Sequence, residues 1–533
     1  MSKKVRRKDK AKETPLVQNM NGEHQPQNNN FYENFLYLII LTVFFLFVYG
    51  YIFDKKLDLN GDNAYYFVLG KALSQGKGYV NIANIDNAPN NHYPPGYPFV
   101  LSIFMFISDS VVFLKIINGI FLLASLFMFY YLFNYFSKSP KIAFVAVFFL
   151  LLNSHLLLYG TMLMSELSFI LFSFLCLFFI LRTDFERRLF RKPDVYLILI
   201  TLVAAYYIRS TGIALFGGLL LYLILRKYWK AAIFIFIGFI TFAMPWIIRG
   251  QKLGGSAYIK PLIMVNPYRP ELGNAGFTEY VIRFLSNLSR YITREIPSST
   301  LPFIHVNYLE EIQAIEWLIG FIIIAFIVYG LYKLGRKGLI LYTYLLVTFG
   351  ILLMWPEVWT GVRFVLPVVP LILFAGLIGL YNFLKYVLAR SRMNLKFNVL
   401  LLLLFGLAYI APIKNLHIKA SNDYPASWKN YFTVAEWFKR EGLKDVVVIC
   451  RKPMLFHLRS GTYTSTYAYV NDGEQLIEDL KARQADFVVL DNLGYRQTYE
   501  YLLPAINSHK DQFQVIFKLD NPDTYLLKFN PEN

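Results

Sequence analysis

Long apolar segments alternate with short polar segments over most of this chain. The hydrocarbon core of a bilayer is about 30 Å thick, so a helix needs about 20 mostly apolar residues to cross it. Eleven segments come close to that length, and the short run 98–108 is expected to be a half-buried helix before the second span. A crossing hidden within 98–136 would raise the count to 12 or 13. The expected spans are 33–53, 110–136, 141–158, 165–182, 194–208, 211–226, 231–248, 316–333, 338–355, 364–385 and 397–413.

The segments are too long and too evenly apolar to be the strands of a membrane barrel. Only helices and closed barrels satisfy their backbone hydrogen bonds inside lipid. The pattern therefore predicts a polytopic α-helical membrane protein, with a transmembrane domain over 31–414.

Lysine and arginine cluster after every second apolar segment. The N-terminal stretch 1–30 is also basic and polar, and its composition is typical of a disordered tail. Positive residues collect on the cytoplasmic side of membrane proteins, so we expect the N-terminus in the cytoplasm and the C-terminus outside. Three long segments then lie on the outer side: the loops 54–97 and 249–315, and the C-terminal stretch 415–533.

The stretch 415–533 is expected to form a small α/β domain outside the membrane. Short runs rich in Val, Ile and Phe alternate there with a helical pattern. The expected strands are Val446–Ile449, Phe487–Leu490, Phe513–Phe517 and Tyr525–Phe529, with a helix over Glu474–Arg483.

Composition agrees with a membrane protein, because 56% of the residues are hydrophobic, 18% are aromatic and the mean hydropathy is +0.41. The formal net charge is +18. Such a charge on a soluble protein would suggest a nucleic-acid partner. Here the basic residues lie at helix ends, which argues against nucleic acid. The abundance of Asn, Lys and Phe is typical of a bacterium with an AT-rich genome, so we expect a bacterial plasma membrane protein.

Asp62 opens the first outer loop, just before a helical pattern that runs from Asn63 to Gln75. An aspartate at this place is typical of a helix N-cap. It could also be a general base at the membrane surface, which removes a proton from an acceptor while that group attacks a sugar carbon. The two roles are compatible, since capping would orient the carboxylate. Asp54, Asp58 and Asp86 are competing candidates in the same loop.

Glu166 begins the fourth span, directly after Ser165. In the simplest interpretation Ser165 caps the helix and Glu166 complements its dipole. An ionisable group at the edge of an apolar span, however, usually faces a cavity. The expected topology places Glu166 on the same side as Asp62.

Arg209, Arg249 and Arg363 also fall on the outer side, which the positive-inside rule depletes of cations. In the simplest interpretation, these side chains extend toward the membrane interface, as arginines at helix ends commonly do. A guanidinium also binds phosphate oxygens in a bidentate manner. We therefore expect at least one of the three to contact a phosphate on a lipid carrier.

The segment His92-Tyr93-Pro94-Pro95-Gly96-Tyr97-Pro98 closes the first outer loop, and its three prolines make it rigid. Its simplest role is to lead into the next helix. A zinc site needs several His, Cys or acidic ligands at suitable spacing, and His92 has no such neighbours in the sequence. We therefore predict no metal site; a divalent metal has no support in the sequence, and no cofactor is predicted.

The order of these motifs resembles that of GT-C glycosyltransferases. The chain is similar to the aminoarabinose transferases of lipid A and the dolichyl-phosphate-mannose protein mannosyltransferases, the glycosyltransferase family 39-like group. The likeness covers about residues 60–380. It rests on Asp62-Asn63-Ala64-Tyr65-Tyr66, Tyr93-Pro94-Pro95-Gly96-Tyr97-Pro98, Ser165-Glu166, Arg209-Ser210-Thr211-Gly212, Pro245-Trp246 with Arg249, and Arg363-Phe364-Val365-Leu366-Pro367 with Pro370.

The resemblance implies an inverting transfer of a sugar from a polyprenyl-phosphate donor on the outer face of the membrane. Asp62 and Glu166 would be the acidic residues of the site. The substrate-binding candidates are Tyr66, His92, Tyr93, Arg209, Arg249 and Arg363. The family's loop typically carries an Asp-Glu pair, whereas this chain has Asn63 at the second position. A role of the pair in holding a metal is therefore not supported.

Two other classes of function stay open. A transporter or flippase of polyprenyl-linked glycans would place charged or broken helices near mid-membrane, but the polar residues here gather at the outer rim. A glycan polymerase or ligase would use outer arginines without needing Asp62 as a base. The acceptor, whether lipid, protein or cell-envelope glycan, and the sugar are not specified by the sequence.

Overall fold

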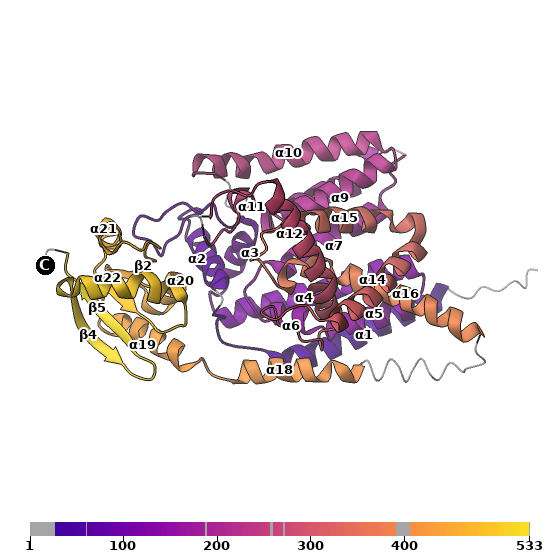
Figure 1. Ribbon diagram of the computed structural model, residues 1–533. Helices are drawn as coiled ribbons and strands as arrows, with labels where there is room; N and C mark the ends of the chain where they lie inside the picture. The colour runs from indigo at the N-terminus through magenta and orange to yellow at the C-terminus, as the bar shows by residue number, and fades with distance from the viewer. Residues whose placement is uncertain are drawn as a thin grey trace, which may run out of the picture.

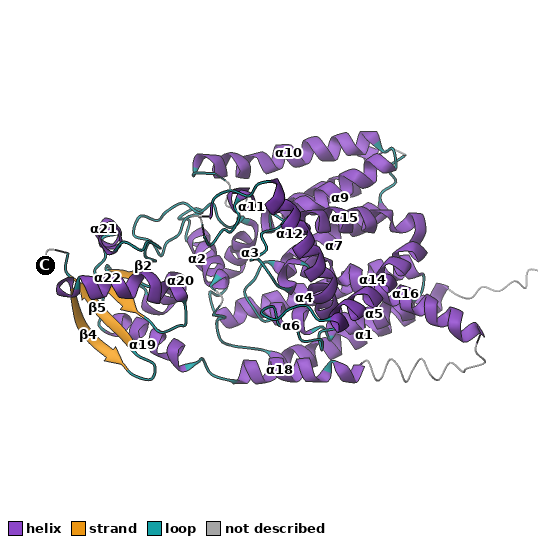
Figure 2. Ribbon diagram, in the orientation of Figure 1, coloured by secondary structure: helices purple, strands orange, loops and turns teal. Residues whose placement is uncertain are grey.

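The protein is described by a computed structural model that covers residues 27–59, 61–186, 189–255, 259–269, 272–390 and 406–531. The predicted tail 1–30 lies almost wholly outside the described residues, and most of the predicted span 397–413 lies outside them too. Helices make up most of the described chain, and the strands gather near the C-terminus (Figures 1 and 2).

The N-terminal two thirds form a bundle of helices around one apolar core. Closely packed pairs include α14 with α16, α7 with α8, and α9 with α15. The helices are α1 (Gln27–Ile52), α2 (Asp62–Ser74), α3 (Gly96–Met105), α4 (Val111–Ser137), α5 (Pro140–Leu151), α6 (Ser154–Gly160), α7 (Glu166–Arg182), α8 (Asp194–Ile208), α9 (Gly212–Leu225), α10 (Trp229–Lys252), α11 (Ile259–Ile263), α12 (Phe277–Arg290), α13 (Ile296–Thr300), α14 (Ala314–Leu334), α15 (Leu339–Leu353), α16 (Val369–Arg390) and α18 (Ile410–Ser421).

Within the described residues, five helical segments are long and apolar enough to cross a membrane, or six if the bent pair α5–α6 is one span. The chain is therefore a polytopic membrane protein. Helices α8 and α9 are apolar but only 15 and 14 residues long. The expected total of eleven spans stays a prediction.

The predicted span 141–158 is not one straight helix. Helices α5 and α6 meet at an angle of 62°. The cause is Asn153, whose side-chain oxygen accepts hydrogen bonds from the backbone N–H groups of His155 and Leu156 and so caps a new helix. The expected half-buried helix at 98–108 is present as α3.

The segment 249–315, expected to be an outer loop, is more helical than its Gly-, Pro- and Asn-rich sequence indicated. Helix α10 continues to Lys252, beyond the predicted end at 248. Helix α12 turns apolar side chains such as Phe277 and Ile282 outward and buries Arg283 and Asn287. Its polar face bonds to backbone carbonyls of the bundle, so tertiary contacts stabilise a helix that the local sequence did not reveal.

The first outer loop contains the predicted helix as α2. Gly61 precedes it with φ of +100°, a conformation that other residues rarely adopt. At the end of the loop, a Cβ on Gly96 would lie 2.5 Å from the backbone carbon of Tyr207. Only glycine therefore lets the proline-rich turn approach the end of α8.

The C-terminal region holds a five-stranded sheet in the order β2-β1-β3-β5-β4. The predicted strands and the predicted helix α21 are all found. Strand β1 is parallel to both β2 and β3, whereas β5 is antiparallel to its neighbours. The elements are α19 (Ala426–Arg440), β1 (Val447–Ile449), α20 (Pro453–Ser460), β2 (Tyr463–Ser465), α21 (Gly473–Ala482), β3 (Phe487–Leu490), α22 (Leu503–Ser508), β4 (Phe513–Leu519) and β5 (Thr524–Phe529).

Helix α2 joins this region to the bundle (Figure 1). Its Ala64 and Val68 belong to the same buried apolar cluster as Tyr431, Phe456 and other side chains of the C-terminal region. The backbone N–H of Thr464 also donates to the carbonyl of Ala83 (2.7 Å). The helix that carries Asp62 is thus fixed against the C-terminal sheet.

Candidate functional site

Four charged side chains from distant parts of the sequence meet beside the start of α2. Asp62 and Glu166 are the first residues of α2 and α7, Arg209 follows α8, and Arg363 lies in the short helix η5 (Val362–Phe364). Arg363 joins the two acids, because its Nη1 donates to Asp62 Oδ2 (2.7 Å) and its Nε donates to Glu166 Oε1 (2.5 Å). We call these four residues the charged cluster.

Glu166 is the buried centre of the charged cluster. Its side chain is fully buried and also accepts a hydrogen bond from Arg209 Nη1 (2.5 Å). A buried carboxylate is costly unless cations and hydrogen bonds compensate it. Two arginines provide that compensation, so the two acids and two guanidinium groups of the cluster sum to zero charge.

Asp62 is the accessible acid of the charged cluster, with 27% of its side chain exposed. Its Oδ1 accepts a hydrogen bond from the Tyr93 hydroxyl (2.8 Å). The N-cap of α2 is Gly61, so the expectation that Asp62 caps the helix is wrong, but Asp62 is an acid in the first turn and complements the helix dipole as expected. Tyr93 and Arg363 orient the carboxylate instead.

Ser165 departs from its expected role as well. It occupies the N-cap position of α7 but makes no side-chain capping bond. Its hydroxyl oxygen instead accepts a hydrogen bond from Arg209 (3.1 Å) and lies 3.2 Å from the hydroxyl of Tyr66. Tyr66 is buried, and its ring centroid lies 4.9 Å from that of Tyr93. Ser165 therefore contacts the charged cluster through Arg209, and Tyr66 packs against Tyr93, which bonds to Asp62.

Two predicted site residues do not join the charged cluster. Arg249 donates to the backbone carbonyl of Tyr79 (3.0 Å), so it holds the first outer loop. His92 is exposed and packs its ring edge-on against Tyr93, with centroids 4.5 Å apart. Asn63, at the family's usual glutamate position, is buried and donates to the backbone carbonyl of Asp58 (2.7 Å).

A second ion pair supports the segment that carries Arg363. Glu295 is fully buried and lies 2.7 Å from Arg290 Nε. Its Oε1 also accepts a hydrogen bond from the backbone N–H of Gly361 (3.4 Å). Sequence analysis missed this pair, because α12 and the segment after it were expected to be a loop.

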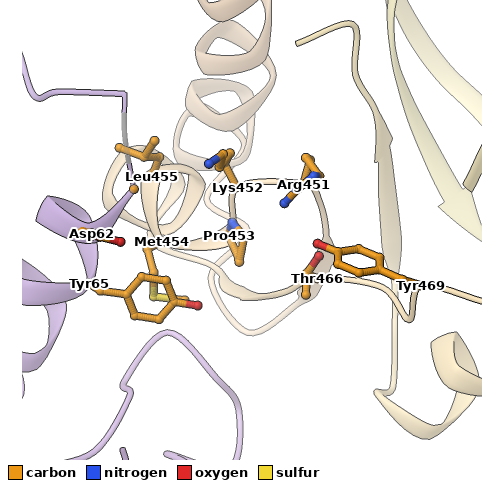
Figure 3. Close-up of a pocket in the computed structure, with 10 residues that line it drawn as sticks. Asp62, Tyr65, Arg451, Lys452, Pro453, Met454, Leu455, Thr466 and Tyr469 are labelled. Carbon is orange, nitrogen blue, oxygen red and sulfur yellow. The ribbon is translucent and has the colours of Figure 1, made fainter. Parts of the chain in front are cut away.

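Asp62 also faces a cavity of about 210 Å³ that it shares with the C-terminal region. Figure 3 shows Asp62 and Tyr65 on one side, Arg451, Thr466 and Tyr469 on the other, and Lys452 between them. The remaining lining residues are Gly61, Pro453, Met454 and Leu455. Sequence analysis did not single out the C-terminal lining residues. The sequence feature that could have identified them is the basic pair Arg451-Lys452, which comes shortly after a predicted strand.

Across the described ranges, no group of three or more His, Cys, Asp or Glu side chains is placed to hold a metal ion. The charged cluster offers two carboxylates, but each is already paired with arginine.

Comparison with known proteins places the fold. No protein-family model and no curated protein sequence matches the chain. Several solved structures do, among them ArnT from Cupriavidus metallidurans bound to undecaprenyl phosphate and the same protein in the apo state. The TM-score is 0.57 for both, the identities are 13% and 12%, and the matches cover 92% of this chain and 97% of ArnT. The chain is thus similar in fold to ArnT, an aminoarabinose transferase of the GT-C type.

Proposed function

We propose that this protein is a glycosyltransferase that moves a sugar from a polyprenyl-phosphate donor to an acceptor on the outer face of the membrane, with inversion at the anomeric carbon. The observation that carries the proposal is the position of Asp62, which belongs to the charged cluster and also lines the cavity. The ArnT-like fold supports the same chemistry, because that protein was solved with undecaprenyl phosphate bound. The proposed topology has the N-terminus in the cytoplasm and the C-terminal region outside.

In the proposed reaction, an acceptor hydroxyl oxygen attacks the anomeric carbon from the side opposite the phosphate. The new C–O bond forms as the bond between the anomeric carbon and the phosphate oxygen breaks, and polyprenyl phosphate leaves. Asp62 takes the acceptor proton as general base. Arg363 orients the Asp62 carboxylate through its hydrogen bond to Oδ2.

The charge balance of the cluster fits this reaction. The four side chains sum to zero while Asp62 is ionised. Once Asp62 is protonated, two guanidinium groups face only Glu166, and the cluster carries one net positive charge. The leaving phosphate gains one negative charge in the same step. The cluster thus becomes attractive to phosphate as the negative charge develops, which is the condition for stabilising a transition state.

Glu166 has a positioning role in this proposal. It is fully buried behind Arg209 and Arg363 and bonds to both of them. It holds the two guanidinium groups where the phosphate is expected. Arg249 is proposed to order the first outer loop rather than to contact the phosphate.

The test uses purified protein in lipid nanodiscs with a panel of radiolabelled polyprenyl-phosphate sugars and cell-envelope extract as acceptor. The expected result is labelled acceptor together with released polyprenyl phosphate. A flippase would instead move the labelled lipid across vesicles without releasing polyprenyl phosphate. Mass spectrometry of surface glycans in a deletion strain then identifies the sugar and the acceptor.

A further inference from the structure

We infer that the cavity between Asp62 and the C-terminal region binds an anionic group of the sugar acceptor, and that Arg451 and Lys452 form its anion site. This inference rests on the proposed function and adds the chemical class of the acceptor: a hydroxyl compound that carries a phosphate or carboxylate close to the hydroxyl.

The topology of the C-terminal sheet indicates where a ligand would bind. The chain passes from β1 to β2 on one side and then crosses to β3 on the other side of β1. In open α/β sheets, ligands bind beyond the carboxyl ends of the strands at such a reversal. Arg451 and Lys452 follow β1, Thr466 and Tyr469 follow β2, and Tyr495 follows β3.

The charges at this place favour an anion. Neither Arg451 nor Lys452 forms an ion pair with a carboxylate among the residues that the structure describes. Both instead lie over the ring of Tyr495, with the Arg451 guanidinium carbon 4.5 Å and Lys452 Nζ 4.6 Å from its centroid. A tyrosine ring holds a cation in place without neutralising it.

Helix α20 adds to this attraction. It begins at Pro453, and the residues of its first turn line the cavity beside Lys452. The N-terminus of a helix carries a partial positive charge and unpaired N–H groups, which together bind anions. The helix dipole and the two side chains therefore act on the same space.

Polar atoms inside the cavity wall also lack partners. Arg451 Nε and Thr466 Oγ1 are buried and make no hydrogen bond with the described protein atoms. The Arg451 Nη2 donates to Gln497 (3.2 Å), which keeps the guanidinium at the cavity edge. Figure 3 shows the ends of Arg451, Thr466 and Tyr469 turned toward one another.

The geometry separates this anion site from the donor phosphate. The polyprenyl chain of the donor lies in the membrane, so its phosphate is expected on the bundle side of Asp62, beside Arg209 and Arg363. Arg451 and Lys452 lie on the other side of Asp62, in the C-terminal region (Figure 3). An acceptor held there would present its hydroxyl to Asp62 from the side away from the bundle.

The experiment measures binding to full-length protein in nanodiscs of phosphatidylcholine. The probes are glycerol 3-phosphate, for a soluble or polymer acceptor, and dihexanoyl phosphatidylglycerol, for a lipid acceptor; glycerol is the neutral control. Binding of polyprenyl phosphate is measured in parallel. The variants are the double substitution Arg451→Gln with Lys452→Gln, the single substitution Lys452→Gln in case the double variant folds poorly, and Lys439→Gln as an exposed cation of α19.

We expect wild type and Lys439→Gln to bind at least one anionic probe saturably and to bind glycerol far more weakly. Loss of both cations should weaken that binding about tenfold or more, because each substitution removes a charge-assisted hydrogen bond to the anion. Polyprenyl phosphate affinity should stay within about twofold. The anionic probe that binds more tightly identifies the source of the anion.

Equal affinity of the double variant and wild type would overturn the inference, as would the absence of saturable anion binding to wild type. Weaker binding of polyprenyl phosphate to the double variant would assign the cavity to the donor instead. Failure of wild type to bind polyprenyl phosphate, with anion binding intact, would reject the proposed function and the acceptor assignment while leaving the anion site.

Discussion

The charged cluster, which reaches the cavity through Asp62, and the C-terminal wall of that cavity differ in how their charged side chains are paired. Glu166 is fully buried and is compensated by Arg209 and Arg363. In the C-terminal region, outside the cavity lining, Asp491 is almost as deeply buried, with 3% exposure, and has no ion pair in the described part of the chain. Arg451 and Lys452 have no carboxylate partner there either.

The cations of the two regions are therefore held in place in different ways. In the charged cluster, mutual pairing fixes four side chains in place, and a proton transfer at Asp62 is needed to release net charge. In the C-terminal wall, the cations are held by an aromatic ring and keep their charge for a ligand. The first arrangement suits a phosphate whose negative charge increases in the transition state, and the second suits an anion whose charge does not change during the reaction.

The largest expected effect comes from breaking the charged cluster at Glu166. Glu166→Gln leaves Arg209 and part of Arg363 buried without a counter-charge, so we expect a loss of about 3–5 kcal/mol in stability. The melting temperature of purified protein measures this loss. Glu441→Gln removes an exposed pair with Arg440 and should change stability by less than about 1 kcal/mol. Equal melting temperatures for the two variants would show that the cluster is not structural.

The next effect concerns Asp491, the buried acid of the C-terminal region, whose burial outweighs the nearby Arg451 and the hydrogen bond from Leu493. Burial raises the pKa of the Asp491 carboxyl from 3.8 to about 6. Because its folded pKa exceeds its unfolded pKa, its contribution to stability is present at low pH and is lost as the pH rises through about 6. Asp491→Asn cannot ionise and should keep the backbone hydrogen bond from Leu493.

The stability gain of Asp491→Asn over wild type should therefore grow from about zero at pH 4 to about 3 kcal/mol at pH 8, since one pKa unit corresponds to about 1.4 kcal/mol. Melting temperatures of both proteins over that range check the prediction. A gain that does not change with pH would mean that Asp491 ionises normally in the folded protein.

A smaller effect is expected at Arg363. Arg363→Ala removes a guanidinium from the expected phosphate site and should weaken polyprenyl phosphate binding by about 1.5–3 kcal/mol. Anion binding at Arg451 and Lys452 should not change. Arg363→Lys keeps the charge without the bidentate geometry and should fall between the two. Unchanged polyprenyl phosphate affinity in the alanine variant would move the phosphate contact to Arg209.

The smallest effect on stability is expected at Lys452, in the C-terminal wall of the cavity. Replacing Lys452 by glutamine breaks no ion pair with the residues that the structure describes and removes its contact with the Tyr495 ring. We expect a stability change of at most about 1 kcal/mol, measured by melting temperature. A loss as large as that of Glu166→Gln would show that Lys452 is a structural residue rather than a ligand-binding one.

The sequence predicted those features that depend on local pattern. Apolar run lengths located most of the long helices, and the strands of the C-terminal sheet followed from short runs of Val, Ile and Phe. The alternation of basic residues grouped Asp62, Glu166, Arg209, Arg249 and Arg363 at the same ends of their helices. All but Arg249 meet in the charged cluster, because residues at the same end of neighbouring helices can meet in space.

Features that depend on tertiary contacts could not be predicted. The break at Asn153 requires a side chain to cap a helix within an apolar run. The polar side of α12 is buried because the bundle supplies carbonyl partners. Arg249 looked equivalent to Arg363, but the first outer loop folds back over it. The cavity itself exists only because α2 packs against the C-terminal region.

The most direct test of the account is the activity of Asp62→Asn, with Asp86→Asn as an exposed control from the same loop. Sugar transfer from a polyprenyl-phosphate donor to envelope acceptor is measured alongside binding of polyprenyl phosphate. The account predicts that Asp62→Asn folds and binds polyprenyl phosphate but transfers sugar about 10²–10⁴-fold more slowly, while Asp86→Asn matches wild type. Transfer by Asp62→Asn at the wild-type rate would contradict the assignment of Asp62 as the base.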